Sequence, residues 1–118
     1  MALSIDVHPG DHHWNVALIG DFDYSECATF RMTIDRILRH TPHATILDLA
    51  ALDYLDSSGL GLLLSLAKEY GATGGRLVLV TNNAVDSILD LTKLSAIFST
   101  TDSLEAAESM LADTAGGH

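Results

Sequence analysis

The chain has 118 residues, of which 47% are hydrophobic, and this is enough for one domain with a single core. Six Lys and Arg residues against sixteen Asp and Glu residues give a formal net charge of −10, which repels nucleic-acid phosphates and anionic lipids. The single cysteine, Cys27, excludes an intrachain disulfide and suits a reducing compartment. The sequence shows neither a secretory signal nor an apolar run long enough to span a membrane. We therefore expect a cytoplasmic domain that binds neither nucleic acid nor membrane directly.

The first part of the chain predicts an antiparallel hairpin followed by a helix. Apolar and polar residues alternate over 3–7 and again over 14–22, as in half-buried strands, and turn-forming residues lie between them. Asp23 or Ser25 is the expected N-cap of the helix, which should end near Pro42. The apolar face of this helix is formed by Phe30, Ile34, Ile37 and Leu38.

The middle of the chain alternates between expected strands and helices. Compact apolar runs at 44–49 and 76–80 predict buried strands. Residues 53–59 are expected to form a loop that leads into a helix at 60–70. This helix is apolar on most sides in its first turns, so it should lie at the centre of the packing.

The last part of the chain predicts a helix that opens at Asn82, a short edge strand near 94–98 and a final helix. Asp102, with Glu105 three residues later, resembles a capping box at the start of that final helix. The element order is ββαβαβαβα, which indicates a single α/β domain with a mixed sheet and packed helices. We expect this domain to span 1–113 and residues 114–118 to form a flexible C-terminal tail.

The segment 55–61, Leu-Asp-Ser-Ser-Gly-Leu-Gly, differs from the rest of the sequence. It lies where a buried strand leads toward a helix, at the edge where open α/β sheets place functional groups. A helix N-terminus carries unpaired amides and partial positive charge, so a phosphate added to a hydroxyl there is tolerated. A serine before an apolar helix is also a common N-cap, so the pattern alone favours the cap. A nucleophilic serine is disfavoured because no histidine is placed as its base.

Four stretches in the same order resemble the STAS domain family, specifically the bacterial anti-sigma factor antagonists. Residues 56–61 resemble the phosphorylation motif of the family. Residues 20–23 resemble its Gly-Glu-Leu-Asp motif, with Asp21 in place of Glu. Residues 74–80 and 88–98 resemble two further segments, so the similarity covers nearly the whole chain.

The resemblance implies a partner switch controlled by phosphorylation. Unphosphorylated members of the family bind an anti-sigma factor, a serine kinase with a GHKL-type ATP site, and thereby free a sigma factor. That kinase phosphorylates a serine of the motif, which breaks the complex, and a metal-dependent phosphatase of the PP2C type removes the phosphate. By this resemblance Ser58 is the acceptor, with Ser57 as the alternative. The implied partner-binding residues are Asp23, Asp56, Ser57, Ser58, Gly59, Leu60 and Gly61.

The resemblance implies a regulatory binding module with no catalytic residues, metal or cofactor of its own. One alternative is a STAS subunit of another assembly, such as a stressosome or a lipid-transport complex. Another is a receiver-like domain with an aspartyl phosphate, and a third is a small hydrolase that uses Ser58. His8, His12 and His13 cluster at the expected hairpin turn, and this pattern favours a solvated turn over a metal site. The sequence does not predict the oligomeric state.

Overall fold

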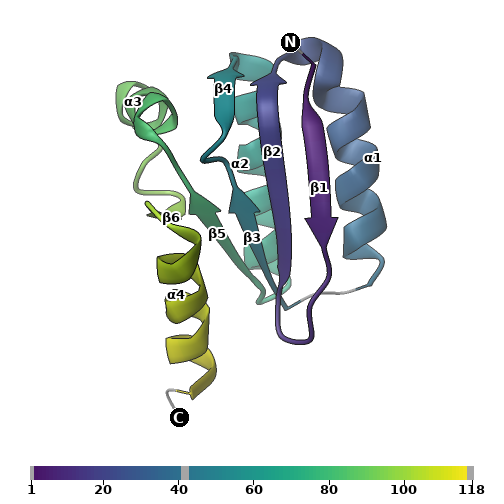
Figure 1. Ribbon diagram of the computed structural model, residues 1–118, viewed down its shortest axis with the longest axis vertical. Coiled ribbons are helices and arrows are strands. Elements are labelled where there is room, and N and C mark those ends of the chain that lie inside the picture. The colour runs from purple at the N-terminus through teal and green to yellow at the C-terminus, as the bar shows by residue number, and fades with distance from the viewer. Residues whose placement is uncertain (1, 41–42, 117–118) are drawn as a thin grey trace.

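The computed structural model describes residues 2–40 and 43–116 and shows a mixed β-sheet with helices on both faces (Figure 1). The strands are β1 (Ser4–His8), β2 (Trp14–Phe22), β3 (Ala44–Asp48), β4 (Leu52–Leu55), β5 (Arg76–Val80) and β6 (Ser99–Thr101). The helices are the short 3₁₀ helix η1 (Tyr24–Glu26), α1 (Cys27–Leu38), α2 (Ser57–Ala72), α3 (Asn83–Leu91) and α4 (Leu104–Gly116). The predicted α/β class with a mixed sheet is confirmed.

The sheet is organised around β2. The strand order is β1-β2-β3-β5-β6; β1 pairs antiparallel with β2, as predicted, and the other neighbours pair in parallel. The first half of β2 pairs with β3, and its second half pairs in parallel with β4. The register shifts between Gly20 and Asp21, where Gly20 has a φ of 104° that residues with a Cβ rarely adopt. The glycine thus lets one strand serve two successive partners.

Helices cover the two faces of the sheet unequally. Helices α1 and α2 pack against one face, and α4 packs against β3 and β5 on the other (Figure 1). The larger core includes Val16, Leu18, Leu47, Leu79, Phe30, Ile34, Leu63 and Leu66. The smaller core consists of Ala44, Ile46, Val78, Val80, Ala107 and Leu111. Each of these buried aliphatic or aromatic side chains contributes roughly 1.5–3 kcal/mol when it is as large as Val or Leu.

The structure differs from the sequence prediction around residue 53, where a short strand takes the place of the expected loop. In β4, Leu52 and Leu55 are buried while Asp53 and Tyr54 are exposed, so the strand lacks the alternation that identifies a half-buried strand. The strand β4 forms because it pairs with the end of β2, and this long-range pairing outweighs the weak strand pattern of its own sequence. Helix α2 consequently begins at Ser57, three residues before the predicted start.

The C-terminal elements also differ in detail. The edge strand β6 lies at 99–101, after the predicted stretch at 94–98. The hydroxyl of Ser103, and not the carboxylate of Asp102, accepts the capping hydrogen bond of α4, from the amide of Ala106 at 3.0 Å. Helix α4 continues through 116, so it includes three of the five residues assigned to a tail, and 117–118 lie outside the described residues.

Asn82 caps α3, as predicted, and also holds the connection between β3 and β4. Its Oδ1 accepts a hydrogen bond from the amide of Val85 at 2.8 Å. Its Nδ2 donates to the carbonyls of Leu49, Ala50 and Leu52 at 3.3, 3.2 and 2.9 Å. One side chain therefore fixes the position of the chain that leads into β4.

No helix among the described residues combines the length and the apolar character needed to cross a bilayer.

The hydroxyls of Tyr70 and Thr45 form a buried hydrogen bond. Tyr70→Phe should lower the free energy of unfolding by about 1–2 kcal/mol, because Thr45 is left buried without its partner. Thr45→Val in the Tyr70→Phe background should recover part of this loss, since both polar groups are then removed. Urea denaturation of the three variants measures the effect, and equal stability of Tyr70→Phe and the parent would contradict it.

Burial also raises the pKa of Tyr70 above its ordinary value of 10.0. The unfolded chain then ionises at lower pH than the folded one, so the contribution of Tyr70 to stability is complete below pH 10.0 and declines above it. The parent should lose stability more steeply than Tyr70→Phe over this alkaline range.

Candidate functional site

Asp56 links the N-terminal ends of two helices through one carboxylate. Its Oδ1 accepts a hydrogen bond from the amide of Gly59 at 2.9 Å and thereby caps α2. Its Oδ2 accepts one from the amide of Tyr24 at 3.0 Å, at the start of η1. The amide of Asp56 itself donates to the carbonyl of Phe22 at 3.2 Å. The ends of β2 and β4 and the starts of η1 and α2 are therefore held together, and both helix dipoles favour the negative charge between them.

Asp23 caps η1 beside this point, which decides between the two predicted caps. Its Oδ1 accepts hydrogen bonds from the amide of Ser25 at 3.0 Å and from the Ser25 hydroxyl. The carbonyl of Asp23 accepts a hydrogen bond from Cys27 Sγ at 3.6 Å. Asp23 thus lies on the same edge of the sheet as Asp56.

The thiol of Cys27 lies close to both carboxylates. Burial raises its pKa, and the negative charges of Asp56 and Asp23 raise it further. A raised pKa keeps the thiol protonated at neutral pH, whereas a redox-sensing cysteine needs a lowered one. The surroundings of Cys27 therefore suit a small packing residue and not a redox sensor.

Ser57 and Ser58 are the first two residues of α2, directly after its cap. Ser57 is exposed and Ser58 is half-buried, so neither hydroxyl is enclosed in the core. The first amides of an α-helix have no acceptor within the helix, and they carry partial positive charge. This is an environment in which an added phosphate would be stabilised by the helix on which it stands.

The remaining residues of the motif divide into two groups. Gly59 and Leu60 are buried, and a Cβ on Gly59 would lie 2.9 Å from the carbonyl oxygen of Phe22 and 2.9 Å from Leu55 Cδ1. Gly59 and Leu60 therefore pack α2 closely on β2 and β4, and their part in binding a partner stays a prediction. Gly61 is exposed, and nothing lies within 4 Å of where its Cβ would be.

Two exposed tyrosines border the site and were missed by the sequence reasoning. The side chain of Tyr24 is 77% exposed and that of Tyr54 is 55% exposed. Tyr54 lies opposite Asp21 in the pairing of β4 with β2, and Tyr24 is the residue whose amide Asp56 binds. In the sequence, each tyrosine is an aromatic residue close to the end of a strand, and this pattern fits a packed side chain equally well.

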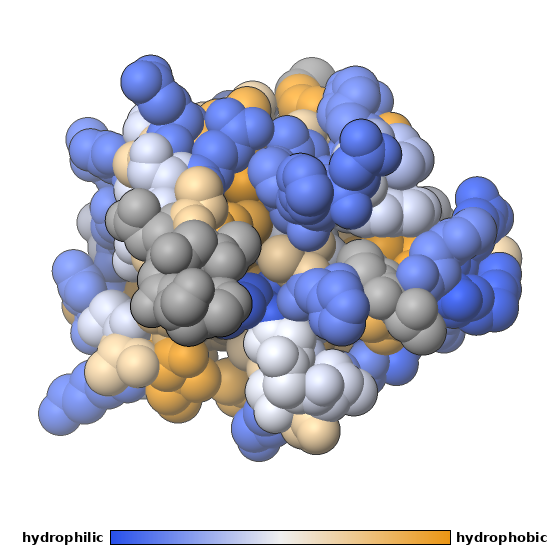
Figure 2. Space-filling view, turned by 90° about the horizontal axis from the view of Figure 1, so that it is seen from below, coloured by the Kyte–Doolittle hydropathy of each residue, from blue (hydrophilic) through white to orange (hydrophobic). Residues whose placement is uncertain are grey.

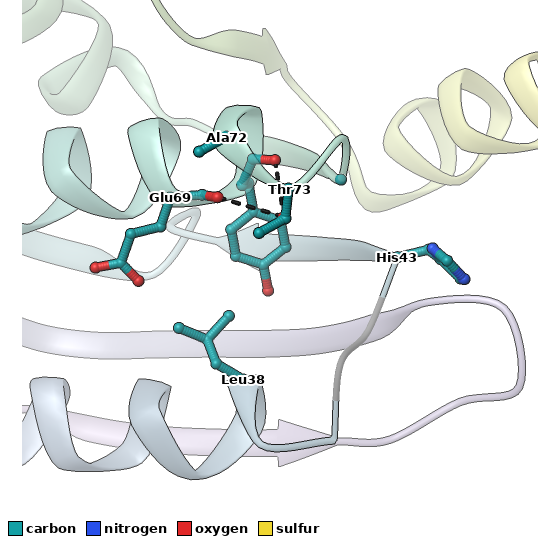
Figure 3. Close-up of a pocket in the computed structure, with 7 residues that line it drawn as sticks. Leu38, His43, Glu69, Ala72 and Thr73 are labelled. Atoms are coloured by element: carbon teal, nitrogen blue, oxygen red, sulfur yellow. Dashed lines mark hydrogen bonds between the residues drawn. The ribbon is translucent and has the colours of Figure 1, made fainter.

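The serines lie away from every described histidine and from the cavities of the molecule. The histidines at 8, 12–13, 40 and 43 lie at the other end of β2 and β3, so none of these described imidazoles is placed as a base for Ser58. A cavity of about 430 Å³ lies between the C-terminal ends of α1 and α2, where it is lined by residues such as Leu38 and Glu69 (Figure 3). Across residues 2–40 and 43–112, no cluster of metal-binding side chains is found. The site is a surface formed where the starts of η1 and α2 meet the ends of β2 and β4.

A family model and a curated relative both match most of this chain. The family model for the STAS domain matches residues 4–107. An anti-sigma F factor antagonist from Paenibacillus polymyxa is 31% identical over 102 residues, which cover 82% of this chain and 85% of that protein. The chain therefore belongs to the STAS domain family, as the resemblance of its motifs predicted.

Solved structures show the same fold. An anti-sigma factor antagonist from Mycobacterium paratuberculosis matches with a TM-score of 0.84 and 24% identity, over 95% of this chain and 96% of that one. The antagonist SpoIIAA in its unphosphorylated form matches with a TM-score of 0.76 and 21% identity, over 98% of both chains. The phosphorylated form of SpoIIAA from Bacillus matches with a TM-score of 0.69 and 22% identity, over 92% of this chain and 99% of that one.

The two glycines of the motif should respond in opposite ways to alanine. Gly59→Ala should lower the free energy of unfolding by about 1–3 kcal/mol, because its Cβ meets the backbone of β2. Gly61→Ala should raise it by about 0.5–1 kcal/mol, because alanine has the higher helix propensity and meets open space. Thermal and urea denaturation test both variants, and a Gly59→Ala protein as stable as the parent would contradict this packing.

Proposed function

We propose that this protein is an anti-sigma factor antagonist whose unphosphorylated form binds an anti-sigma factor and thereby frees a sigma factor. The observation that carries the proposal is the pair of accessible serines at the start of α2, beside the carboxylate of Asp56. The relative from Paenibacillus polymyxa, an anti-sigma F factor antagonist, supports the same function. The protein acts by binding and has no catalytic activity of its own.

The surface around the serines fits a partner that is both apolar and basic. Tyr24 and Tyr54 offer large, rigid side chains of the kind that dominate binding energy in protein interfaces. Asp23 and Asp56, within a chain of net charge −10, steer a cationic surface toward this edge. Exposed Gly61, with no side chain, allows the partner backbone to approach the first turn of α2.

Phosphorylation of Ser58 would change this surface without requiring a change of fold. It adds about −1.5 to −2 charges at neutral pH, next to the carboxylates of Asp56 and Asp23. Within the domain, the amides and the positive end of α2 offset part of that charge. A partner that had packed against a neutral hydroxyl would instead enclose an unpaired anion, and this lowers affinity by about a hundredfold or more.

The reactions that set the state of the switch belong to other proteins. We propose that the anti-sigma factor, through a GHKL-type serine kinase domain, phosphorylates Ser58, with Ser57 as the alternative acceptor. A metal-dependent phosphatase of the PP2C type would restore the hydroxyl. These steps place the protein in the cytoplasm, where sigma factors act. Membership in the STAS family disfavours the alternative of an aspartyl-phosphate receiver.

The direct test is capture of partners from the native host with the parent protein, Ser58→Ala and Ser58→Asp. The parent and Ser58→Ala should retain an ATP-binding kinase, and Ser58→Asp should lose it, because only the last carries a charge at the interface. Binding of the purified kinase by calorimetry should show a loss of about a hundredfold for Ser58→Asp. Mass spectrometry after incubation with the kinase and ATP identifies the modified serine, and Ser57→Ala serves as the matched control.

Equal recovery of the kinase by all three proteins would contradict the switch. Capture of other STAS proteins or of membrane-transport subunits, without a kinase, would favour a subunit of a stressosome or lipid-transport complex.

In the calorimetric measurement of kinase binding, Tyr54→Ala should weaken the complex by about tenfold or more. Met32→Ala, which truncates an exposed side chain on α1, should leave the affinity unchanged.

A further inference from the structure

Tyr24 is positioned mainly by its backbone, because most of its side chain lies in solvent. The side chain is 77% exposed, so packing does little to hold it in place. Its amide donates a hydrogen bond to Asp56 Oδ2 at 3.0 Å, and its carbonyl accepts one from the amide of Cys27. The bond from Cys27 is local, whereas the bond to Asp56 spans 32 positions of the sequence and reaches the start of α2. The carboxylate of Asp56 therefore sets the place of Tyr24 relative to the two serines.

The shape of η1 is fixed separately, by Asp23. Its Oδ1 accepts hydrogen bonds from the amide and the hydroxyl of Ser25, and its carbonyl accepts one from the amide of Glu26 at 3.0 Å. These contacts lie within residues 23–26, so they can persist when the contact with Asp56 is broken. Loss of the Asp56 contact would then leave η1 formed but free to move relative to α2, and Tyr24 would move with it.

The other exposed tyrosine of the site is held in a different way. Tyr54 lies on β4 opposite Asp21 of β2, so strand pairing fixes its backbone. Exposure alone does not mark either tyrosine, because apolar residues also reach the surface at the opposite end of the molecule, among hydrophilic ones (Figure 2). Tyr24 differs in that a charged side chain next to the serines binds its backbone.

A phosphate on Ser58 would compete with the carboxylate of Asp56. Both groups would lie at the start of α2, where Asp56 Oδ1 accepts a hydrogen bond from the amide of Gly59. The amides at a helix N-terminus attract either anion, and a phosphate brings about −1.5 to −2 charges against the single charge of a carboxylate. Like charges placed this close repel each other. The phosphate would therefore weaken the hydrogen bonds that Asp56 makes at α2 and, through its other oxygen, at Tyr24.

We propose that Asp56 positions Tyr24 for the partner, and that a phosphate on Ser58 releases Tyr24 by displacing this carboxylate. The inference rests on the proposed function of the serines and adds a second effect of the phosphate. Binding is lost because the partner meets an anion and also because one of its aromatic contacts moves away. Asp56 thus acts on the partner through Tyr24.

Asparagine at position 56 separates the two contacts of the carboxylate. Asparagine caps a helix as well as aspartate does, so Asp56→Asn should keep the bond from the amide of Gly59. The other end of its side chain is an NH₂ group, which cannot accept a hydrogen bond from Tyr24. In NMR measurements on the full chain, Asp56→Asn should speed solvent exchange of the Tyr24 amide about tenfold and change that of Gly59 less than about twofold. Asp53→Asn, which removes an exposed carboxylate from β4, should leave both rates unchanged.

Phosphorylation of Ser58 should also speed exchange of the Tyr24 amide, by about threefold or more, because the phosphate displaces Asp56. Phosphoserine incorporated at Ser65, an exposed position further along α2, is the matched control and should have no effect. Unchanged exchange of the Tyr24 amide, either in Asp56→Asn or after phosphorylation of Ser58, would overturn the proposal.

A double-mutant cycle in the calorimetric measurement of kinase binding tests the positioning role itself. Tyr24→Ala should weaken the complex by about tenfold or more. In that background, Asp56→Asn should weaken it no further than Asp53→Asn does, because the side chain that Asp56 positions is already absent. In the Tyr54→Ala background, Asp56→Asn should keep its full effect. Additive effects of Tyr24→Ala and Asp56→Asn would contradict the positioning role.

The exchange measurements need no partner, so they separate this inference from the proposed function. If no kinase binds the parent protein, the proposed function fails, and the role of Tyr24 in binding fails with it. If the kinase binds the parent and releases Ser58→Asp, but the Tyr24 amide exchanges equally in the parent and in Asp56→Asn, only the positioning role fails.

Discussion

The geometry of the site depends on a single carboxylate that accepts hydrogen bonds from two helices. Asp56 binds the amide of Gly59 at the start of α2 and the amide of Tyr24 at the start of η1, 32 positions earlier in the chain. Both oxygens are used, so neither asparagine nor alanine at this position would preserve the pair of contacts. Because the two helices start at one point, Asp23 and the two serines share one edge of the sheet.

This arrangement places the serines at the surface and the apolar residues of α2 in the core. Beneath the serines, the apolar residues of α2 and the close contact of Gly59 with β2 fix the helix on the sheet. Above them, the first turn of α2 presents hydroxyls and a bare glycine at Gly61. A charge placed on Ser58 would meet helix amides on its own side and a partner on the other. The cost of that charge would therefore fall on the interface more than on the fold.

Much of the fold could be predicted because local patterns agree with the tertiary structure. Alternation predicted β1 and β2. Short polar side chains before apolar runs predicted a cap at Asn82 and another at Asp23 or Ser25, of which the structure shows Asp23. The prediction failed where long-range contacts decide the outcome. The short strand β4 forms through pairing with β2, although its own sequence lacks alternation.

The candidate site could be predicted only in part, because long-range packing decides which residues of the motif are exposed. A motif shows that serines and glycines are adjacent, but packing against β2 decides that Gly59 is internal and Gly61 external. The contact of Asp56 with Tyr24 and the contact of Asn82 with the carbonyl of Leu52 both join segments that are distant in the sequence. Sequence patterns describe neighbours along the chain, so neither feature had a local signal.

The central claim is that a phosphate on Ser58 changes the surface while the fold persists. Amide chemical shifts of the protein carrying phosphoserine at position 58, compared with those of the unmodified protein, test it most directly. We predict large changes confined to 23–26 and 56–61, with the amides of β3 and β5 unaffected. Changes that spread through β3, β5 and α4 would contradict the account, because the phosphate would then act by rearranging the core.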